Sequence, residues 1–240
     1  MNKFLFIFIF FTFCLNVPSL LAAPIHDAVQ NKNINKAYLI IKENPNSINQ
    51  ENEYGWTPLH ISASLGDLDT AKMLLSCKAD VNARANNGHT PLHKACYGGF
   101  EKMAELLINS KAEINAQSSN GSQSIHAAAY NGNKNLIGLL LRKGAKVNAI
   151  TSVGQTPLHI SAMQGRYKVL SLLVEQGANI DAKDNEGRTP LYLAVEEEKI
   201  ECIETLLKLK AKPDIKTKKG FSAQDLAKKN PKIAKFFVKK

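Results

Sequence analysis

Six glycines recur along this chain at intervals of 33 residues, and this period constrains the fold more than any other feature of the sequence. They stand at positions 55, 88, 121, 154, 187 and 220. The clearest copy of the segment that begins at each glycine is 154–159, which reads Gly-Gln-Thr-Pro-Leu-His. A fixed period of this length is typical of repeat architectures, in which each unit buries its apolar face only against its neighbours.

The residues of one unit predict its local structure. Thr156 before Pro157 is typical of a helix N-cap followed by proline at the first helical position, where the missing N–H costs nothing. Gly165 separates this helix from a second apolar segment at 169–174, and Gly177 is suited to a left-handed C-cap. The stretch that follows is polar and turn-forming. Each unit is therefore predicted to be an antiparallel helix pair followed by a projecting turn.

These residues resemble the ankyrin repeat, which has a period of 33 residues and a Thr-Pro-Leu-His-x-Ala signature. The match extends from Pro24 to Lys240, and the Thr-Pro-Leu-His tetrapeptide is complete at 57–60, 90–93 and 156–159. The resemblance implies an all-α ankyrin-repeat solenoid of six to seven units, built from antiparallel helix pairs with projecting β-hairpin-like turns. Residues 123–126 lack the Thr and Pro, Tyr192 replaces the histidine, and Glu198 replaces a glycine. We expect these departures to weaken single helix caps and not the fold.

The N-terminal segment does not belong to the repeat. Residues 1–22 have the layout of a secretory signal peptide: Lys3 is the only charge, an apolar stretch follows, and small residues precede a cut after Ala22. An uncleaved anchor is the alternative, because the apolar segment is about as long as a membrane-spanning helix. We therefore expect an exported protein, periplasmic or secreted, or one anchored to a membrane by this segment.

The rest of the chain divides into three parts. Residues 23–54 are expected to form an N-terminal capping repeat, 55–219 the repeats that start at 55, 88, 121, 154 and 187, and 220–240 a Lys-rich C-terminal capping repeat. Twelve lysines and two aspartates lie between Lys208 and Lys240, so this stretch accounts for the whole net charge of +10. Lysine keeps a terminal helix soluble, but such an asymmetry also attracts an anionic partner.

No pattern in the sequence predicts catalysis. The family resemblance implies a structural role for the repeat histidines, whose imidazoles would hydrogen-bond the backbone and join neighbouring units: His26, His60, His93, His126 and His159. The cysteines show neither disulfide nor zinc spacing, and we expect Cys96 and Cys202 to be buried and Cys77 to be more exposed. Adjacent carboxylates at 196–198 would point to different sides of a helix. We predict no catalytic, cofactor or metal site, and no enzymatic activity.

The candidate binding surface follows from the positions that do not recur between units. They flank the turn glycines and the exposed end of each first helix, whereas the core positions repeat. In ankyrin-like folds these two rows line a concave groove that contacts partners. The predicted partner-binding residues are Tyr54, Trp56, Leu65, Asn87, His89, Tyr97, Asn120, Tyr130, Asn131, Val153, Gln155, Met163, Gln164, Glu186 and Arg188.

Aromatic side chains make this surface a candidate for protein binding. Tyr54, Trp56, Tyr97 and Tyr130, with Met163, are expected to form a stripe across successive units, although Trp56 also suits packing against the preceding cap. We therefore predict a monomeric, non-enzymatic scaffold that binds a protein partner and has no small-molecule substrate. The alternative is an electrostatic binder of an anionic lipid, polymer or nucleic acid through the Lys-rich cap. We do not expect nucleic acid, because no aromatic stacking platform interleaves the lysines.

Overall fold

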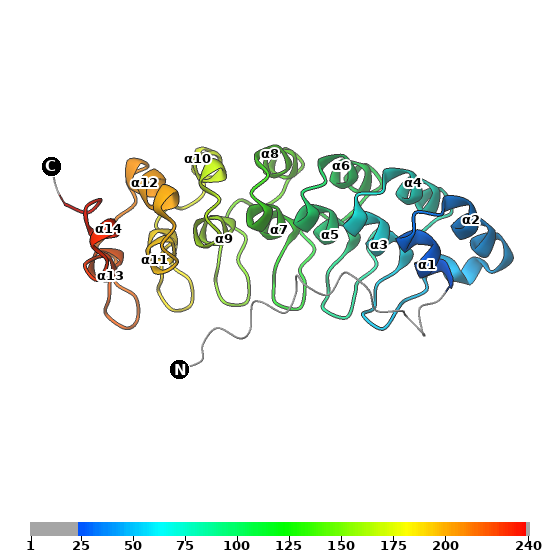
Figure 1. Cartoon of the computed structure of the whole chain (residues 1–240), viewed down its shortest axis with the longest axis horizontal. Coiled ribbons are helices and arrows are strands. Elements are labelled where there is room, and N and C mark those ends of the chain that lie inside the picture. The colour runs from blue at the N-terminus through cyan, green and yellow to red at the C-terminus, as the bar shows by residue number, and fades with distance from the viewer. Residues whose placement is uncertain (1–23, 239–240) are drawn as a thin grey trace.

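The helices of this chain form two rows, which run side by side along an elongated stack (Figure 1). The computed structural model describes residues 24–238, so the predicted signal peptide at 1–22 lies outside the described residues. The described part contains seven helix pairs. The inner row is α1 (Pro24–Gln30), α3 (Pro58–Leu65), α5 (Pro91–Gly98), α7 (Ser124–Asn131), α9 (Pro157–Met163), α11 (Pro190–Glu196) and α13 (Ala223–Ala227). The outer row is α2 (Ile34–Glu43), α4 (Leu68–Ser76), α6 (Glu101–Asn109), α8 (Lys134–Arg142), α10 (Tyr167–Glu175), α12 (Ile200–Lys208) and α14 (Pro231–Ala234). The predicted all-α solenoid is confirmed.

The inner helices begin where the sequence predicts. Thr156 is the N-cap of α9, its hydroxyl accepts a hydrogen bond from the His159 N–H, and Pro157 occupies the first helical position. Glu198 keeps the left-handed backbone conformation of the glycines it replaces, with φ +53°. The predicted weak cap at Gln123 retains the bond from its N–H to His126 Nδ1, but its buried Oε1 has no hydrogen-bond partner among the described residues.

The core runs continuously between the two rows. Small residues fill one repeated position on the inner helices, as at Ala63 and Ala129, and leucines fill another on the outer helices, as at Leu74 and Leu140. Small side chains let neighbouring inner helices approach closely, and the leucines provide most of the buried apolar surface. Cys96 and Cys202 are fully buried and Cys77 is half-buried, as predicted. None of the helices within 24–238 is long and apolar enough to cross a membrane.

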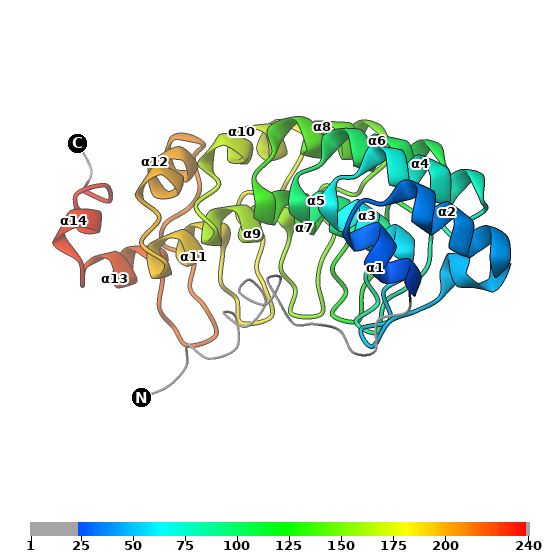
Figure 2. The same cartoon turned by 45° about the vertical axis from the view of Figure 1, so that its right-hand side comes forward.

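The turns between units form a row of hairpins along one edge of the stack, which Figure 2 shows below the inner helices. They are hairpin-like in their backbone bonds, such as Thr151 N–H to Gln155 O at 3.0 Å, but the described residues form no extended strand. Each hairpin after the first also donates one backbone bond to the hairpin before it. These bonds are Asn86 N–H to Tyr54 O, Ser119 N–H to Asn87 O, Ser152 N–H to Asn120 O, Asn185 N–H to Val153 O, and Lys218 N–H to Glu186 O. The hairpins therefore form one connected edge.

Candidate protein-binding surface

The repeat histidines join each unit to the next, as the family resemblance implied. His60 Nε2 lies 3.0 Å from the carbonyl oxygen of His89, and its Nδ1 lies 3.1 Å from the backbone nitrogen of Thr57. The other Nε2 contacts are His26 to Trp56 O, His93 to Ser122 O, His126 to Gln155 O, and His159 to Arg188 O. His26 takes part although it lies 34 residues before His60 instead of 33. All five predicted histidines therefore make an inter-unit contact.

These contacts fix the protonation state of the ring. Since a backbone N–H can only donate, Nδ1 of His60 and His93 must be an unprotonated acceptor, which leaves Nε2–H to donate to the carbonyl. Burial lowers the pKa of His60 and of His93 to about 4. Burial likewise lowers the pKa of His126 and His159. At neutral pH these imidazoles are uncharged structural groups and not poised acids or bases.

A second ladder between units, in the segments that follow the outer-row helices, was missed by the sequence interpretation. Asn115 Oδ1 accepts from the Lys146 N–H at 3.2 Å, while its Nδ2 donates to Gly144 O at 3.0 Å. Asn82 and Asn148 make the same pair of bonds, and Asp181 makes the acceptor half. Their 33-residue spacing is visible in the sequence. Because asparagine is common in turns, this spacing alone does not indicate bonds between units.

The hairpins and the inner helices together form the surface predicted to bind partners, which we call the groove face. It comprises hairpin residues 52–56, 85–89, 118–122, 151–155 and 184–188, together with the ends of the inner helices beside them. A pocket of about 170 Å³ opens on it between the third and fourth hairpins. Its lining residues are Tyr97, Asn120, Ser122, His126, Tyr130, Thr151, Ser152, Val153, Gln155 and Ile160.

The pocket has apolar walls and a polar hairpin rim. Tyr97 and Tyr130 are half-buried and their rings meet edge to face with centroids 5.9 Å apart. Ile160 lies beside them on the inner helices, and Val153 projects from the hairpin with 51% of its surface exposed. Rigid aromatic rings with a few polar groups at the edge are typical of sites that accept an apolar side chain of a partner.

The aromatic residues of the groove face gather in two clusters within the described chain. In the first, the ring centroids of Trp56 and Tyr54 lie 6.4 Å apart, and the ammonium of Lys94 lies 3.8 Å from the centre of the Trp56 ring. In the second, Tyr97 contacts both Tyr130 and His89, with a centroid distance of 5.4 Å to the imidazole. Lys94 is buried on α5, where the neighbouring units carry apolar residues. The first cluster therefore includes a cation that was not predicted.

His89 was expected to lie at the surface of a turn, but it is half-buried between two rings. It stacks on His93 at 5.2 Å with the rings nearly parallel, and it contacts Tyr97. Burial lowers the pKa of His89 to about 3, and repulsion from Lys94, and from His93 in its protonated form, adds to the shift. His89 is therefore neutral at physiological pH and adds an aromatic face to the second cluster.

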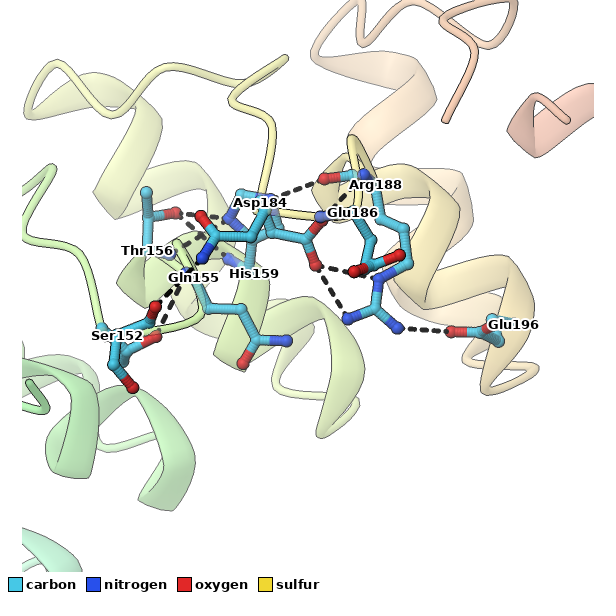
Figure 3. Close-up of polar contacts among 10 residues, drawn as sticks. Ser152, Gln155, Thr156, His159, Asp184, Glu186, Arg188 and Glu196 are labelled. Atoms are coloured by element: carbon cyan, nitrogen blue, oxygen red, sulfur yellow. Dashed lines mark hydrogen bonds and ion pairs between the residues drawn. The ribbon is translucent and has the colours of Figure 1, made fainter. Parts of the chain in front are cut away.

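Charged side chains bound the groove face beyond the pocket (Figure 3). The buried carboxylate of Asp184 accepts from the backbone N–H of Glu186 and of Arg188, and it pairs with the Arg188 guanidinium at 2.8 Å. The other side of that guanidinium lies 3.5 Å from Glu196. Because a buried carboxylate needs such partners, Arg188 acts first as a structural counter-ion. Glu186 and Glu196 are exposed and give this end of the face its acidic character.

The structure brings five of the predicted partner-binding residues to the pocket: Tyr97, Asn120, Tyr130, Val153 and Gln155. Two others make structural bonds, since Asn87 accepts from the His89 N–H and Asn131 donates to Tyr97 O. Leu65, Met163 and Gln164 are half-buried at the ends of α3 and α9. Ile160 and Thr151 line the pocket and were not predicted. Within the described residues, no three His, Cys, Asp or Glu side chains gather as a metal site would require.

Comparison with known proteins identifies the type of repeat. A family model of ankyrin repeats in three copies matches residues 25–118 and again 125–219, and a second ankyrin-repeat model matches 101–141. The ankyrin repeat domain of human ASB11 superimposes with a TM-score of 0.80 at 25% sequence identity. That alignment covers 90% of this chain and 96% of the human domain.

Two curated relatives match a shorter stretch. The human and mouse proteins named protein phosphatase 1 regulatory subunit 27 are each 46% identical to this chain over 66 residues. That stretch is 28% of this chain and 42% of each relative, so the match spans less than half the length of the relatives.

Proposed function

Because this chain belongs to the ankyrin repeat family, we propose that it is a non-enzymatic scaffold that binds a protein partner through the groove face. Ankyrin repeats generally mediate protein–protein interaction. The observation that supports the proposal most directly is the pocket, which is lined by the contacting rings of Tyr97 and Tyr130 and by Val153 of the fourth hairpin. Its size suits one apolar side chain, and the surrounding hairpin atoms suit the polar backbone of an extended segment.

Rigidity is the physical basis of this proposal. The hairpins are bonded to one another by backbone bonds and the histidines hold each hairpin to the helix before it. A surface ordered before binding loses little conformational freedom in the complex, so more of the contact energy appears as affinity. Tyrosine contributes large contact area with few rotatable bonds.

The relatives support a binding role without naming the partner. The human and mouse proteins are named as regulatory subunits of protein phosphatase 1. Since the matched stretch covers only 42% of those proteins, we assign no phosphatase to this chain. The support is limited to the use of these repeats for protein contacts.

A pair of matched variants tests the site. Val153 and Ile150 are neighbouring β-branched residues, exposed by 51% and 58%, but only Val153 lines the pocket. In quantitative affinity capture, Val153→Glu should lose the partners of the unmodified chain, because it places a charge in an apolar pocket. Ile150→Glu carries the same charge change and should retain them. Recovery of the same partners by Val153→Glu would place the binding site elsewhere.

We also propose that the chain is exported after cleavage behind Ala22. The support is the layout of residues 1–22, in which a single charge is followed by an apolar stretch and then by small residues before the cut. N-terminal sequencing of the protein from envelope and medium should return Ala23-Pro24. An intact Met1 in the envelope fraction would instead favour the anchor, and an intact Met1 in the cytoplasm would contradict export.

A further inference from the structure

The Lys-rich end of the stack combines a high positive charge with exposed apolar side chains. It includes the hairpin at 213–222 and the short helices α13 and α14, at the opposite end from α1 (Figure 1). The exposed lysines of this cap are Lys216, Lys218, Lys219, Lys228, Lys229, Lys232 and Lys235. A cap that only maintains solubility needs charged side chains and no exposed phenylalanine. Here Phe221 has 54% of its surface exposed and Val238 has 73%.

Phe221 occupies the hairpin position that Trp56 and His89 hold in earlier units. Trp56 is covered by Lys94 of the following unit, whereas Phe221 faces outward. The neighbouring Gly220 has no atom within 4 Å of where a Cβ would lie, although the same position at Gly88 packs against the next hairpin. The outer side of this hairpin is therefore open within the described structure.

A lysine ammonium group lies near this ring. The Nζ atom of Lys229, which follows α13, lies 5.8 Å from the centre of Phe221, and Lys218 and Lys219 are exposed residues of the same hairpin. Lys235 is placed 4.9 Å from the centre of Phe236 in the same way. The cap as defined contains two carboxylates: Asp214 is exposed, and Asp225 accepts from the Ser222 N–H and hydroxyl and pairs with Lys228 at 2.9 Å. The positive charge around Phe221 thus remains large.

We propose that this cap docks on an anionic phospholipid surface, with Phe221 entering the boundary between headgroups and acyl chains and the lysines facing the phosphates. An interfacial site needs both elements: apolar side chains that leave water and cations that meet the negative surface. Single-stranded nucleic acid would instead require successive exposed rings along a groove, and Phe221 is the one ring among the described cap residues that is mostly exposed. The proposal does not rest on the groove face, so either can fail alone.

Vesicle sedimentation tests the proposal with the mature chain. Binding should be strong to phosphatidylcholine vesicles that contain phosphatidylglycerol, weak to phosphatidylcholine alone, and reduced between about 0.01 M and about 1 M salt, where screening becomes severe. Each cap lysine near the surface should contribute about fivefold in affinity. The triple change Lys218→Gln, Lys219→Gln and Lys229→Gln should therefore weaken binding by about 100-fold.

Two controls distinguish the site from overall charge. The change Lys134→Gln, Lys143→Gln and Lys146→Gln removes the same charge from exposed positions in another unit, and it should alter vesicle binding little. Phe221→Gln keeps every lysine and should weaken binding about tenfold by removing apolar contact. Equal losses in the two triple variants would overturn the proposal. So would equal binding of unmodified chain and Phe221→Gln, or tighter binding to a single-stranded oligonucleotide than to the anionic vesicles.

Discussion

Two reasons could require glycine at each turn of the 33-residue period: the positive φ of the backbone, or close contact with the next hairpin. Alanine variants of the turn glycines distinguish between them. Gly88 and Gly220 occupy the same turn position, with φ of +74° and +81°. At Gly88 a Cβ would lie 2.8 Å from the backbone nitrogen of Ser119 in the next hairpin, whereas at Gly220 it would meet nothing within 4 Å. Replacing each by alanine therefore imposes the same backbone strain, but only Gly88→Ala also displaces a neighbouring hairpin.

The two costs can be estimated. An alanine at positive φ destabilises the folded state by about 1 kcal/mol. Alanine also reduces the conformational entropy of the unfolded chain, which offsets about 0.4–1 kcal/mol of this cost. Gly220→Ala should therefore change the free energy of unfolding by about 1 kcal/mol or less. Gly88→Ala adds overpacking against backbone atoms, which costs about 1–3 kcal/mol, and weakens the 2.9 Å bond from Ser119 N–H to Asn87 O. We expect Gly88→Ala to be the more destabilising by that additional amount.

Urea unfolding followed by circular dichroism measures the difference, provided that the slopes of the curves agree. Gly177→Ala is the interior control, because Gly177 has φ +89° and open space around it, and it should behave like Gly220→Ala. Hydrogen exchange gives a local readout: the Ser119 amide should exchange faster in Gly88→Ala alone. If all three variants are destabilised equally and the Ser119 amide stays protected, the glycine period reflects backbone conformation and not contact between hairpins.

Two further predictions concern charge and protonation. His93 has a pKa of about 4 in the folded protein and near 6.5 in the unfolded chain, so the unfolded chain binds the proton more readily. The contribution of neutral His93 to the free energy of unfolding is therefore complete above pH 6.5 and is lost as the pH falls toward 4, by up to about 1.4 kcal/mol per pH unit. The pH slope from urea unfolding should flatten in His93→Gln, and Lys94→Met should raise the His93 pKa measured by NMR. A slope that His93→Gln leaves unchanged contradicts this account. Asp184→Asn should destabilise by about 1–3 kcal/mol because the carboxylate accepts three hydrogen bonds, whereas Glu196→Gln should change stability by less than about 1 kcal/mol. Comparable urea midpoints for these two variants would contradict the assignment of Asp184 as the structural partner of Arg188.

The sequence predicted the elements that every unit must repeat. Thr156 and Pro157 start a helix for local reasons that no neighbour alters, and the histidine contacts follow from the family pattern. The ladder of Asn82, Asn115 and Asn148 has the same period and also joins neighbouring units, but no family signature pointed to it in the sequence. Turn propensity alone explains an asparagine at such a position, so only the inter-unit distances distinguish the two roles.

The candidate site was predicted less completely, because it depends on how units face one another. Ile160 lines the pocket although the equivalent Ile61 is buried, and no local pattern distinguishes the two. The aromatic residues divide into two clusters, and Lys94 of the following unit covers Trp56 in the first of them. The positions of the aromatic residues in the sequence indicate which units carry them. Contacts with the neighbouring units decide which of these side chains remain exposed.

The stack also explains how the side chains of the groove face can differ between units while the fold stays the same. At hairpin positions 56, 89, 122, 155 and 188 the side chains differ completely: Trp, His, Ser, Gln and Arg. The carbonyl oxygen of each accepts the histidine contact from the preceding unit. Every residue has this carbonyl, so the inter-unit bond places no demand on the side chain. The same holds for Val153, whose carbonyl accepts from Asn185 while its side chain lines the pocket. Backbone atoms therefore maintain the inter-unit contact, and the side chains at these positions can differ between units without disturbing it.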